Sequence, residues 1–559
     1  GYSDIQTEYD WNTRTTSTSF SFAGQTKTAS YTQGNDGREG ISTLISGNQY
    51  STAYDTIGRI DYTYITMPSL NGLRKQINYL GVAGSRTTNI PSSVVYSSGG
   101  SNVLQSSYMY DDNGNIATTT VDGVTYTYTY DSLNQLKTVS TSNNSYSASY
   151  NYDNGGNITS KTVNGTTISY GYGDTNWKDK LTSYDGQSIT YDNLGNPLSY
   201  RGMSFTWTGR RMDSAAVNDV TSSYLYDASG IRTRKTVGGV TTDYFLNGST
   251  ILAEKTGSNV IWYIYDGGSN VLGFIYNGTP YYYLKNQQGD VLSIVDANNN
   301  IVASYTYDAW GKVLSATGSM ANINPIRYRS YYYDAETGFY YLQSRYYDPE
   351  TGRFINADGI LGANQDVLSY NLFAYCSNNP ISRADPTGAF LLELAVASVA
   401  AMTIAVSGMT ALSALGVAGA QTAQRQMTRS IQRSWSNHME MVKKAIGYPS
   451  ASASAKASEQ EKDKAIPKQP KKQAFFTVNP YDFNPKGLVM REFSGTYNGR
   501  IIEWRDPVSK AKIFEWNEDF RYGPHYHAMM IGWGEDHMDI HYLPGTPVPE
   551  PWNSLYFGG

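Results

Sequence analysis

The sequence predicts a mainly β protein, and its composition, its alternation and its repeats all support this. The 559 residues include 50 tyrosines and 53 glycines but only 16 phenylalanines, and 16% are charged. Tyrosine and threonine favour strands, whereas glycine and asparagine favour turns. Runs such as VTYTYTY, residues 124–130, alternate with the period of two that is typical of a strand. We therefore expect a large β body, and the length predicts several domains.

A Tyr-Asp pair followed by turn residues recurs along the first part of the chain. The copies are YDTIGRI at Tyr54, YDDNGNI at Tyr110, YDSLNQL at Tyr130, YDNGGNI at Tyr152, YDNLGNP at Tyr191, YDASGIR at Tyr226 and YDAWGKV at Tyr307. Each copy predicts a strand, a tight turn and a returning strand, in which the aspartate caps the turn and the glycine supplies a positive φ. One hairpin buries too little surface to be stable, so the units must stack into a continuous sheet.

These repeats resemble those of the RHS/YD-repeat family, and the segment from Arg327 to Gly388 resembles its repeat-associated core domain. The matching motifs in this segment are YYLQSRYYDP from Tyr340, Gly352-Arg353-Phe354, Asn378-Asn379-Pro380 and Asp385-Pro386-Thr387-Gly388. The resemblance implies a β-strip that spirals into a hollow shell closed by the core domain. It also implies that a variable C-terminal toxin is held within the shell or released through it.

The sequence then divides into five parts. We expect a YD-repeat β-shell over 1–325, the core domain over 326–388, an apolar and amphipathic helical segment over 389–447, a linker over 448–473 and a small α+β toxin domain over 474–559. The chain begins in mid-pattern, which predicts a piece of a longer protein. Its single cysteine, Cys376, excludes an intramolecular disulfide bond.

The family resemblance further implies that the core domain cuts the chain after its closing DPTG motif. The matching carboxylates are Asp358 and Asp385, with Arg353 to orient or charge-balance them, and the cut would follow Gly388 or Ala389. Two carboxylates can act as general base and acid on one peptide bond. The sequence departs from the family where Asp358 precedes glycine rather than proline, and where alanine rather than leucine follows Gly388. The alternative is that both aspartates only cap turns.

The stretch from Leu394 to Ala420 is uncharged and long enough to span a bilayer, although it is rich in alanine, glycine and serine. It is interpreted as a helix that contacts a target membrane or packs inside the shell, in preference to a plain membrane anchor. Residues 448–473 combine small residues, charges and prolines, a composition typical of a solvated linker.

Four of the five histidines lie between Arg521 and Tyr542. Histidine exchanges protons near neutral pH and binds metals, so the cluster predicts a catalytic centre. The preferred hypothesis is a metal-independent ribonuclease without a cofactor, whose candidate residues are His525, His527, His537, His541, Glu515, Glu518 and Arg521, with Lys512 as an alternative anion partner. The alternatives are a metal-dependent DNase, with the histidines and Asp536 or Asp539 as ligands of a divalent metal, and a non-enzymatic adhesive surface protein with an inert tail.

Residues 474–559 carry seven Lys/Arg against eleven Asp/Glu, so their net charge is negative. A negative net charge does not favour the binding of nucleic acid. The family resemblance nevertheless implies that such toxin domains are frequently nucleases, with RNA, for example tRNA, as the expected substrate. We expect a secreted or cell-wall-associated bacterial protein whose toxin acts in the cytoplasm of a target cell. Its expected partners are a cognate immunity protein and a secretion machine.

Overall fold

The computed structural model describes residues 4–33, 38–67, 72–82, 86–358, 367–388, 392–393, 489–495, 499–505, 512–519 and 523–528. The chain divides into two units, residues 1–433 and 434–559, which are described separately. The first unit contains two large sheets and the core segment, which we define as residues 326–388. The described part of the second unit is a four-stranded sheet.

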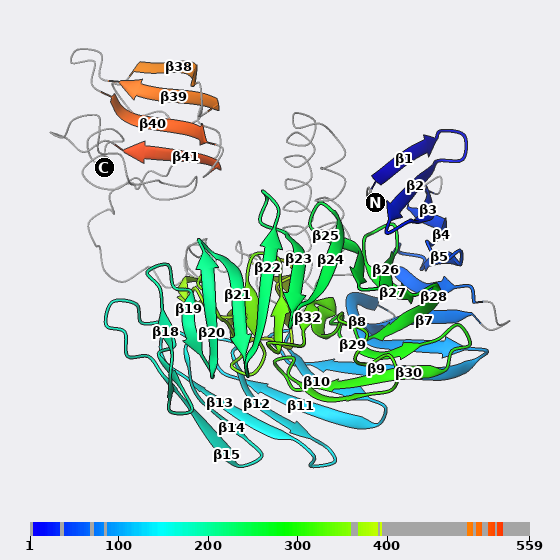
Figure 1. The fold of residues 1–559 in the computed structure, drawn as a ribbon, viewed down its shortest axis with the longest axis horizontal. Coiled ribbons are helices and arrows are strands. Elements are labelled where there is room, and N and C mark those ends of the chain that lie inside the picture. Colours follow the sequence, from blue (N-terminus) through cyan, green and yellow to red (C-terminus); the bar gives the residue numbers. More distant parts are fainter. Residues whose placement is uncertain are drawn as a thin grey trace, which may run out of the picture. The chain divides into compact units, whose positions relative to one another are not determined.

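The first large sheet has 17 strands, each paired antiparallel with its neighbours in sequence (Figure 1). Its strands are β1 (Asp4–Asp10), β2 (Thr15–Phe22), β3 (Gln25–Gln33), β4 (Glu39–Thr43), β5 (Gln49–Tyr54), β6 (Ile60–Ile65), β7 (Leu73–Val82), β8 (Arg86–Ser98), β9 (Ser101–Tyr110), β10 (Ile116–Val121), β11 (Val124–Tyr130), β12 (Leu136–Thr141), β13 (Ser147–Tyr152), β14 (Ile158–Val163), β15 (Thr166–Gly171), β16 (Ser183–Tyr184) and β17 (Gln187–Ser188).

The second large sheet continues the same meander over 14 strands. These are β18 (Thr190–Tyr191), β19 (Pro197–Tyr200), β20 (Met203–Thr208), β21 (Arg211–Val217), β22 (Val220–Tyr226), β23 (Arg232–Val237), β24 (Val240–Asn247), β25 (Thr250–Thr256), β26 (Asn259–Tyr265), β27 (Val271–Tyr276), β28 (Thr279–Lys285), β29 (Val291–Val295), β30 (Ile301–Tyr307) and β31 (Val313–Thr317). The predicted stacking of hairpins into continuous sheets is confirmed.

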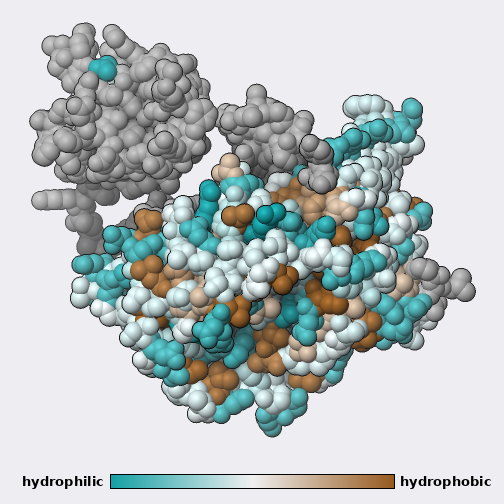
Figure 2. Space-filling model, viewed as in Figure 1, coloured by the Kyte–Doolittle hydropathy of each residue, from teal (hydrophilic) through white to brown (hydrophobic). Residues whose placement is uncertain are grey.

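The core segment folds into short elements that lie between the two sheets (Figure 1). These are η1 (Tyr328–Ser330), β32 (Tyr332–Asp334), β33 (Phe339–Tyr341), β34 (Tyr346–Asp348), β35 (Arg353–Phe354), η2 (Val367–Tyr370), η3 (Cys376–Asn378) and β36 (Arg383–Ala384), after which β37 (Leu392–Glu393) pairs with β36. Buried tyrosines of this segment and of both sheets form one continuous core. On the visible outer face, apolar residues are scattered among polar ones, as expected for a face in contact with water (Figure 2).

The core segment contacts both large sheets, through hydrogen bonds to turns of the first and an ion pair with the second. Two of the cavities within the described part of this unit measure about 260 and 300 Å³, and each has room for several water molecules. The predicted mainly β body is confirmed as two large antiparallel sheets that share a core with the core segment. The helical segment and linker expected over 389–473 lie outside the described residues, apart from β37.

The YD turns show why both residues of the pair recur. In the copy at Tyr130, the Oδ1 atom of Asp131 accepts hydrogen bonds from the backbone N–H groups of Leu133 and Gln135, both at 2.9 Å. The hydroxyl of Tyr130 donates to the carbonyl of Ile116 in the preceding hairpin, at 2.7 Å. The aspartate therefore closes its own turn, as predicted, while the tyrosine ties that turn to the previous repeat, which was not predicted.

Removing one of these tyrosine hydroxyls should weaken the stack. Tyr152 donates to the carbonyl of Leu136 at 2.6 Å, and Tyr152→Phe should lower the free energy of unfolding by about 0.5–1.5 kcal/mol because that carbonyl loses its partner. Denaturant unfolding of the full chain measures this. Tyr370→Phe, at a side chain that is 47% exposed, is the control and should change little. If the two variants were equally stable, the hydrogen bond from Tyr152 would not contribute to the stacking of the repeats.

Candidate functional site

The closing DPTG motif forms a tight turn at the end of the core segment. The Oδ1 atom of Asp385 accepts hydrogen bonds from the backbone N–H groups of Gly388, at 2.9 Å, and Thr387, at 3.4 Å. Gly388 has a φ of +76°, and a Cβ atom there would lie 2.8 Å from the hydroxyl of Ser344. Both the backbone conformation and the space therefore require glycine at position 388. Asp385 caps this turn, as the simpler of the two sequence interpretations expected.

We call the stretch between β36 and β37, where the cut is expected, the candidate seam, of which the structure describes residues 385–388. Arg383 pairs with Glu393 and Ala384 with Leu392 in an antiparallel ladder. The chain therefore returns to the core segment directly after the seam, and a two-residue ladder would still join the two sides if the chain were cut between them. Nothing in the sequence pattern indicated this pairing.

Both candidate aspartates contact one arginine, Arg345. Its Nη2 atom lies 2.8 Å from the Oδ2 atom of Asp358 and 3.3 Å from the Oδ2 atom of Asp385. Its Nε atom donates to the carbonyl oxygen of Gly388, and its Nη1 atom to that of Leu372, at 3.2 Å. Burial lowers the pKa of this guanidinium, and the two aspartates oppose that shift. The structure thus brings the two predicted carboxylates together at the predicted seam.

Arg353, which the sequence analysis assigned to this site, lies elsewhere. Its Nη2 atom donates to the carbonyl of Asp179 at 2.7 Å and lies 3.3 and 3.4 Å from the amide oxygens of Asn371 and Asn157. Arg353 therefore joins the core segment to the turns of the first sheet. The expected contact of Arg353 with the aspartates is therefore wrong, and Arg345 occupies that position instead.

The core segment binds the YD turns through a row of side-chain amides. Three of its asparagines each donate to the amide oxygen of the last residue of a YD turn: Asn379 to Asn115 at 2.9 Å, Asn378 to Gln135 at 2.8 Å and Asn371 to Asn157 at 2.8 Å. In the last of these turns, a Cβ atom at Gly156 would lie 2.5 Å from Leu368. The asparagines of the core motif therefore fix the seam-bearing segment to successive repeats.

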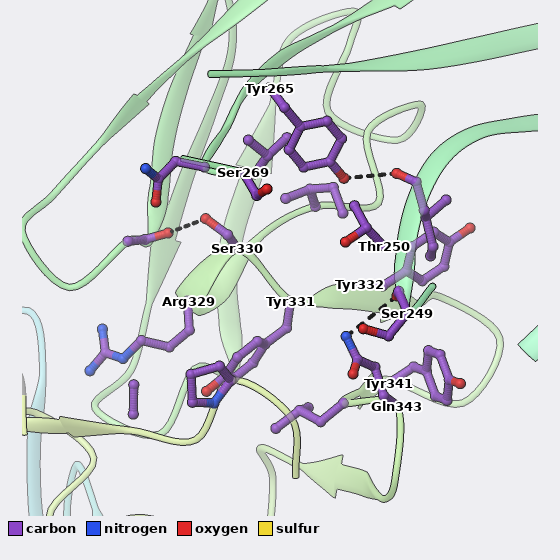
Figure 3. Close-up of a pocket in the computed structure, with 18 of the residues that line it drawn as sticks. Ser249, Thr250, Tyr265, Ser269, Arg329, Ser330, Tyr331, Tyr332, Tyr341 and Gln343 are labelled. Carbon is purple, nitrogen blue, oxygen red and sulfur yellow. Dashed lines mark hydrogen bonds between the residues drawn. The ribbon is translucent and has the colours of Figure 1, made fainter. Parts of the chain in front are cut away.

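A cavity of about 260 Å³ lies beside the seam, between the second sheet and the core segment (Figure 3). Ala384 and Pro386, which flank Asp385, are on its wall together with Leu342 and Gln343. Tyr331 also lines it, and the hydroxyl of Tyr331 accepts a hydrogen bond from the backbone N–H of Asp385 at 3.0 Å. A tyrosine of the core segment therefore helps to hold the closing motif in place.

The four-stranded sheet of the second unit comprises β38 (Val489–Gly495), β39 (Gly499–Arg505), β40 (Lys512–Asp519) and β41 (Gly523–Ala528). One row of paired residues crosses all four strands: Arg491 opposite Glu503, Glu503 opposite Glu515, and Glu515 opposite His527. Directly paired residues share a face of a sheet. This row therefore places an arginine, two glutamates and a histidine on one face.

The same register shows on which face of the sheet the other predicted catalytic residues lie. His525 pairs with Asn517 and lies two positions from His527, so it shares that face. Glu518 lies three positions from Glu515 and falls on the opposite face, which argues against it as a base acting with His525 or His527. Arg491 and Glu503 were not among the residues predicted from the sequence, because their pairing depends on strand register rather than on spacing.

The remaining predicted residues of the second unit, Arg521, Asp536, His537, Asp539 and His541, lie outside the described residues, as does the stretch 394–420. Within the part of the chain that the structure describes, no group of three or more potential metal-binding side chains is present. The same part contains no helix that is long and apolar enough to cross a membrane.

Comparison with known proteins agrees with this architecture. The profile of the Teneurin YD-shell family matches residues 84–381, which is more than half of the chain. The chain belongs to this family. The YD-shell match includes most of the first sheet, all of the second and nearly all of the core segment, so the resemblance of these repeats to the RHS/YD-repeat family is confirmed.

Two curated relatives are tRNA nucleases by name. The tRNA3(Ser)-specific nuclease WapA of Bacillus spizizenii is 34% identical over 276 residues, and the tRNA nuclease WapA of Bacillus subtilis is 35% identical over 276 residues. Each match covers 48% of this chain and 11% of the relative. The chain therefore spans about a tenth of the length of these two relatives. The crystal structure of TcdB2-TccC3-Cdc42 has a TM-score of 0.50 at 18% identity, covering 67% of this chain and 23% of that one, and shows the shared fold.

Proposed function

We propose that this protein is an RHS-repeat toxin of bacterial competition, in which the two-sheet shell and its core segment carry a C-terminal ribonuclease. The observation that carries this proposal is the likeness of the YD-shell chain to proteins named as tRNA nucleases. The substrate we propose is RNA, with tRNA as its leading class. A cognate immunity protein, a secretion machine and a secreted or cell-wall-associated location belong to the same proposal, with the toxin acting in the target cytoplasm.

The ribonuclease chemistry we propose uses the row that crosses the four-stranded sheet. Cleavage of RNA needs a base that takes the 2′-hydroxyl proton, an acid that donates to the leaving oxygen, and a cation for the charge on phosphorus. Glu515 or Glu503 is the proposed base, His527 the proposed acid and Arg491 the proposed cation, with His525 beside them on the same face. These three functions can all be met without a metal ion.

The full chain tests this chemistry directly. Purified protein should cut total tRNA and leave DNA intact, with equal rates in the presence and absence of EDTA. His527→Ala and Glu515→Gln should each slow cleavage by about 10²–10⁴-fold, since each removes one proton-transfer group. His438→Ala, at the fifth histidine outside the cluster, is the matched control and should keep full activity.

The same assay separates the alternatives. Loss of activity in EDTA with cleavage of DNA would replace the ribonuclease by a metal-dependent DNase. An inert protein, without activity on either nucleic acid and without toxicity when expressed in bacteria, would instead support an adhesive surface protein.

We further propose that the core segment cuts its own chain at the seam, with Asp358 and Asp385 as the acid–base pair. Both carboxylates contact Arg345, which also donates to the carbonyl of Gly388, and this arrangement favours self-cleavage over turn capping alone. Asp358 is the proposed base because its side chain is 18% exposed, against 6% for Asp385, so water reaches it more easily. Cutting would break the covalent link between the shell and the toxin, and the pairing of β36 with β37 would then be the remaining described contact across the cut. Purified wild-type protein should then run as two polypeptides on a denaturing gel, and a single intact band would overturn the proposal.

The proposal for residues 394–420 is contact with a target membrane after release. Their uncharged sequence and their place between the seam and the toxin support this role.

A further inference from the structure

We propose that the cavity of about 260 Å³ between the second sheet and the core segment (Figure 3) binds a small organic carboxylate with an apolar body, held by the amine of Lys285. This site is separate from the proposed ribonuclease and from the proposed self-cleavage, and its test depends on neither.

Lys285 occupies the position of the tyrosine in a YD turn. Its Nζ atom donates to the carbonyl of Val271 at 2.7 Å, a hydrogen bond that spans 14 positions. In the preceding turn, the hydroxyl of Tyr265 donates to the carbonyl of Ile251, also at 2.7 Å and across 14 positions. The lysine therefore keeps the hydrogen bond between repeats. A hydroxyl has one proton to donate, whereas an ammonium group has three, so Lys285 has further donors for another partner.

The turn after Lys285 also lacks the aspartate of the YD pair. Asn286 takes its place, and its Oδ1 atom accepts a hydrogen bond from the backbone N–H of Asp290 at 2.8 Å, so this turn is capped without a charge. The carboxylate of Asp290 binds Arg329 instead, with both oxygens 2.8 Å from its Nη1 atom. The change from Tyr-Asp to Lys-Asn thus adds a positive charge and removes a negative one. The hydrogen bond between repeats requires neither change, which indicates a separate role.

The amine of Lys285 lies at the wall of the cavity. Among the described residues it donates to the carbonyl of Val271 and to the hydroxyl of Ser330, the latter at 3.4 Å. Both of these residues line the cavity, as does Lys285 itself. Neither partner carries a charge, so an ammonium group at this wall can take an anion from the cavity as its ion-pair partner.

The surroundings of Lys285 contain more positive than negative charge. The ammonium group of Lys75 lies 5.9 Å from the ring centre of Tyr96, whose hydroxyl accepts a hydrogen bond from the backbone N–H of Lys285 at 3.1 Å. Burial, reinforced by Lys75 and opposed by Asp266, lowers the pKa of Lys285 to about 7. Burial also lowers the pKa of Lys75 to about 8, again opposed by Asp266. The two lysines therefore share one carboxylate, and an anion in the cavity would favour the charged form of Lys285.

Much of the remaining cavity wall suits an apolar body. Aliphatic and aromatic side chains line it, among them Ile251, Val271, Ile326, Leu342, Tyr331 and Tyr332. A cavity of about 150 Å³ is enough to hold benzene, so this larger cavity has room for an aromatic ring and a carboxylate. Benzoate is therefore a suitable probe. It would contact both the second sheet and the core segment.

The test measures the binding of benzoate to the full chain by calorimetry at pH 6 and at pH 9. Benzamide is the matched ligand, because it has the same ring without a charge. Lys285→Met keeps an unbranched side chain but removes its amine. Lys255→Met is the matched control, at an exposed lysine of β25 in the same sheet. Thermal unfolding shows whether each variant folds.

We expect the wild type to bind benzoate at pH 6 and to bind benzamide far more weakly. Lys285→Met should weaken the binding of benzoate by about 10–100-fold, the effect of losing a charge-assisted hydrogen bond, whereas Lys255→Met should leave it unchanged. The wild type should bind benzoate at least about 10-fold more weakly at pH 9 than at pH 6. The reason is that Lys285, whose pKa is about 7, is mostly uncharged at pH 9 and must take up a proton to hold the anion.

Among the groups around Lys285, Lys75 also titrates in this pH range. Burial raises the pKa of the neighbouring tyrosines above their ordinary value, so they stay neutral; these are Tyr96, Tyr265, Tyr331 and Tyr332. Arg329 keeps its charge, and its ion pair with Asp290 is 2.8 Å long. Lys75→Met separates the two lysines. It should raise the pKa of Lys285, because Lys75 helps to lower it, and the loss of affinity should then move to higher pH.

Two results with the wild type alone would overturn the proposal even if no variant folds. These are equal affinity for benzoate and benzamide, and no saturable binding of benzoate at either pH. If Lys285→Met bound benzoate as tightly as Lys255→Met does, Lys285 would not be the group that holds the anion. A pH dependence that vanished in Lys75→Met would likewise assign the anion to Lys75 and overturn the role of Lys285.

Discussion

Replacing Asp334 by asparagine should lower the free energy of unfolding by about 3–5 kcal/mol, the cost of leaving a buried charge without its partner. Asp334 and Arg232 are fully buried and meet through two short contacts, Nη1 to Oδ2 at 2.6 Å and Nη2 to Oδ1 at 2.9 Å. Asparagine keeps the shape of the side chain but not its charge. Denaturant unfolding of the full chain at neutral pH measures the loss.

This ion pair matters because it joins the core segment to the second sheet. Asp334 ends β32 and Arg232 begins β23. The guanidinium also lies over the rings of Tyr341 at 4.3 Å and Tyr332 at 5.2 Å, both in the core segment. A buried arginine enclosed by aromatic rings has no route to water, so the loss of its carboxylate cannot be compensated locally.

The pH dependence of stability provides a second measure of the same pair. Burial alone raises the pKa of Asp334, but Arg232 and Lys235 outweigh it and hold the pKa below its ordinary value of 3.8. The carboxylate therefore contributes its full stability above pH 3.8 and loses it as the pH falls through the lower pKa of the folded state. The difference in stability between wild type and Asp334→Asn should shrink over that acidic range.

An exposed ion pair near Arg232 in the sequence is the control for the effect of burial. Arg234 and Asp243 meet at 2.5 Å, but their side chains are 48% and 42% exposed. Arg234→Ala should therefore cost less than about 1 kcal/mol. Removing both buried charges, with Arg232→Met and Asp334→Leu together, should cost less than Asp334→Asn alone, since no charge of that pair is left unmatched. If the double variant were no more stable than Asp334→Asn, then packing rather than charge would dominate the contact between the core segment and the second sheet.

The sequence was enough to predict the sheets because their local signals agree with one another. Alternation, turn residues and the Tyr-Asp period all specify hairpins of one kind. The role of the tyrosine was missed for a physical reason. The bond from Tyr130 to the carbonyl of Ile116 joins two hairpins, and it depends on how one repeat is placed against the next. The sequence pattern within a single repeat carries no information on that placement.

The residues of the candidate site, too, could be predicted from the sequence only in part. Asp358 and Asp385 were identified through motifs, and the structure brings them to one arginine. Arg345 was not identified, because it reaches the seam through the pairing of β33 with β34 and of β34 with β35. The residues of the amide row are equally distant in sequence: Asn379 and Asn115 meet at 2.9 Å across 264 positions. Contacts of that kind are set by the closed fold and not by any local pattern.

In the second unit, the histidines attracted attention because they are rare elsewhere, and His525 and His527 do lie on one face. The two glutamates and the arginine of the same row lie on other strands. One could have proposed Glu503 and Arg491 from sequence by aligning the apolar positions of the predicted strands, but the register of those strands could not be fixed before the turns were known.

Asp385→Asn should abolish the self-cleavage that we propose, leaving one intact chain where the wild type gives two fragments. Asparagine keeps the shape of the side chain and can still cap the turn at Gly388, but it removes the charge that faces Arg345. Asp358→Asn removes the proposed base and should slow cleavage at least as much, by about 10²–10⁴-fold. Gel analysis and mass measurement of freshly synthesised chains follow the reaction.

Asp348→Asn is the control that separates chemistry from folding. Asp348 is also a buried aspartate of the core segment, and it pairs with Arg201 at 3.0 Å, away from the seam. Its loss should lower stability yet leave cleavage near the wild-type rate. If Asp348→Asn stops cleavage as completely as Asp385→Asn, then the core segment has only to be correctly folded and the two aspartates hold no special role. If only the seam variants stop it, the carboxylates that meet at Arg345 act on the bond itself, and the paired strands β36 and β37 must then separate before the toxin can leave.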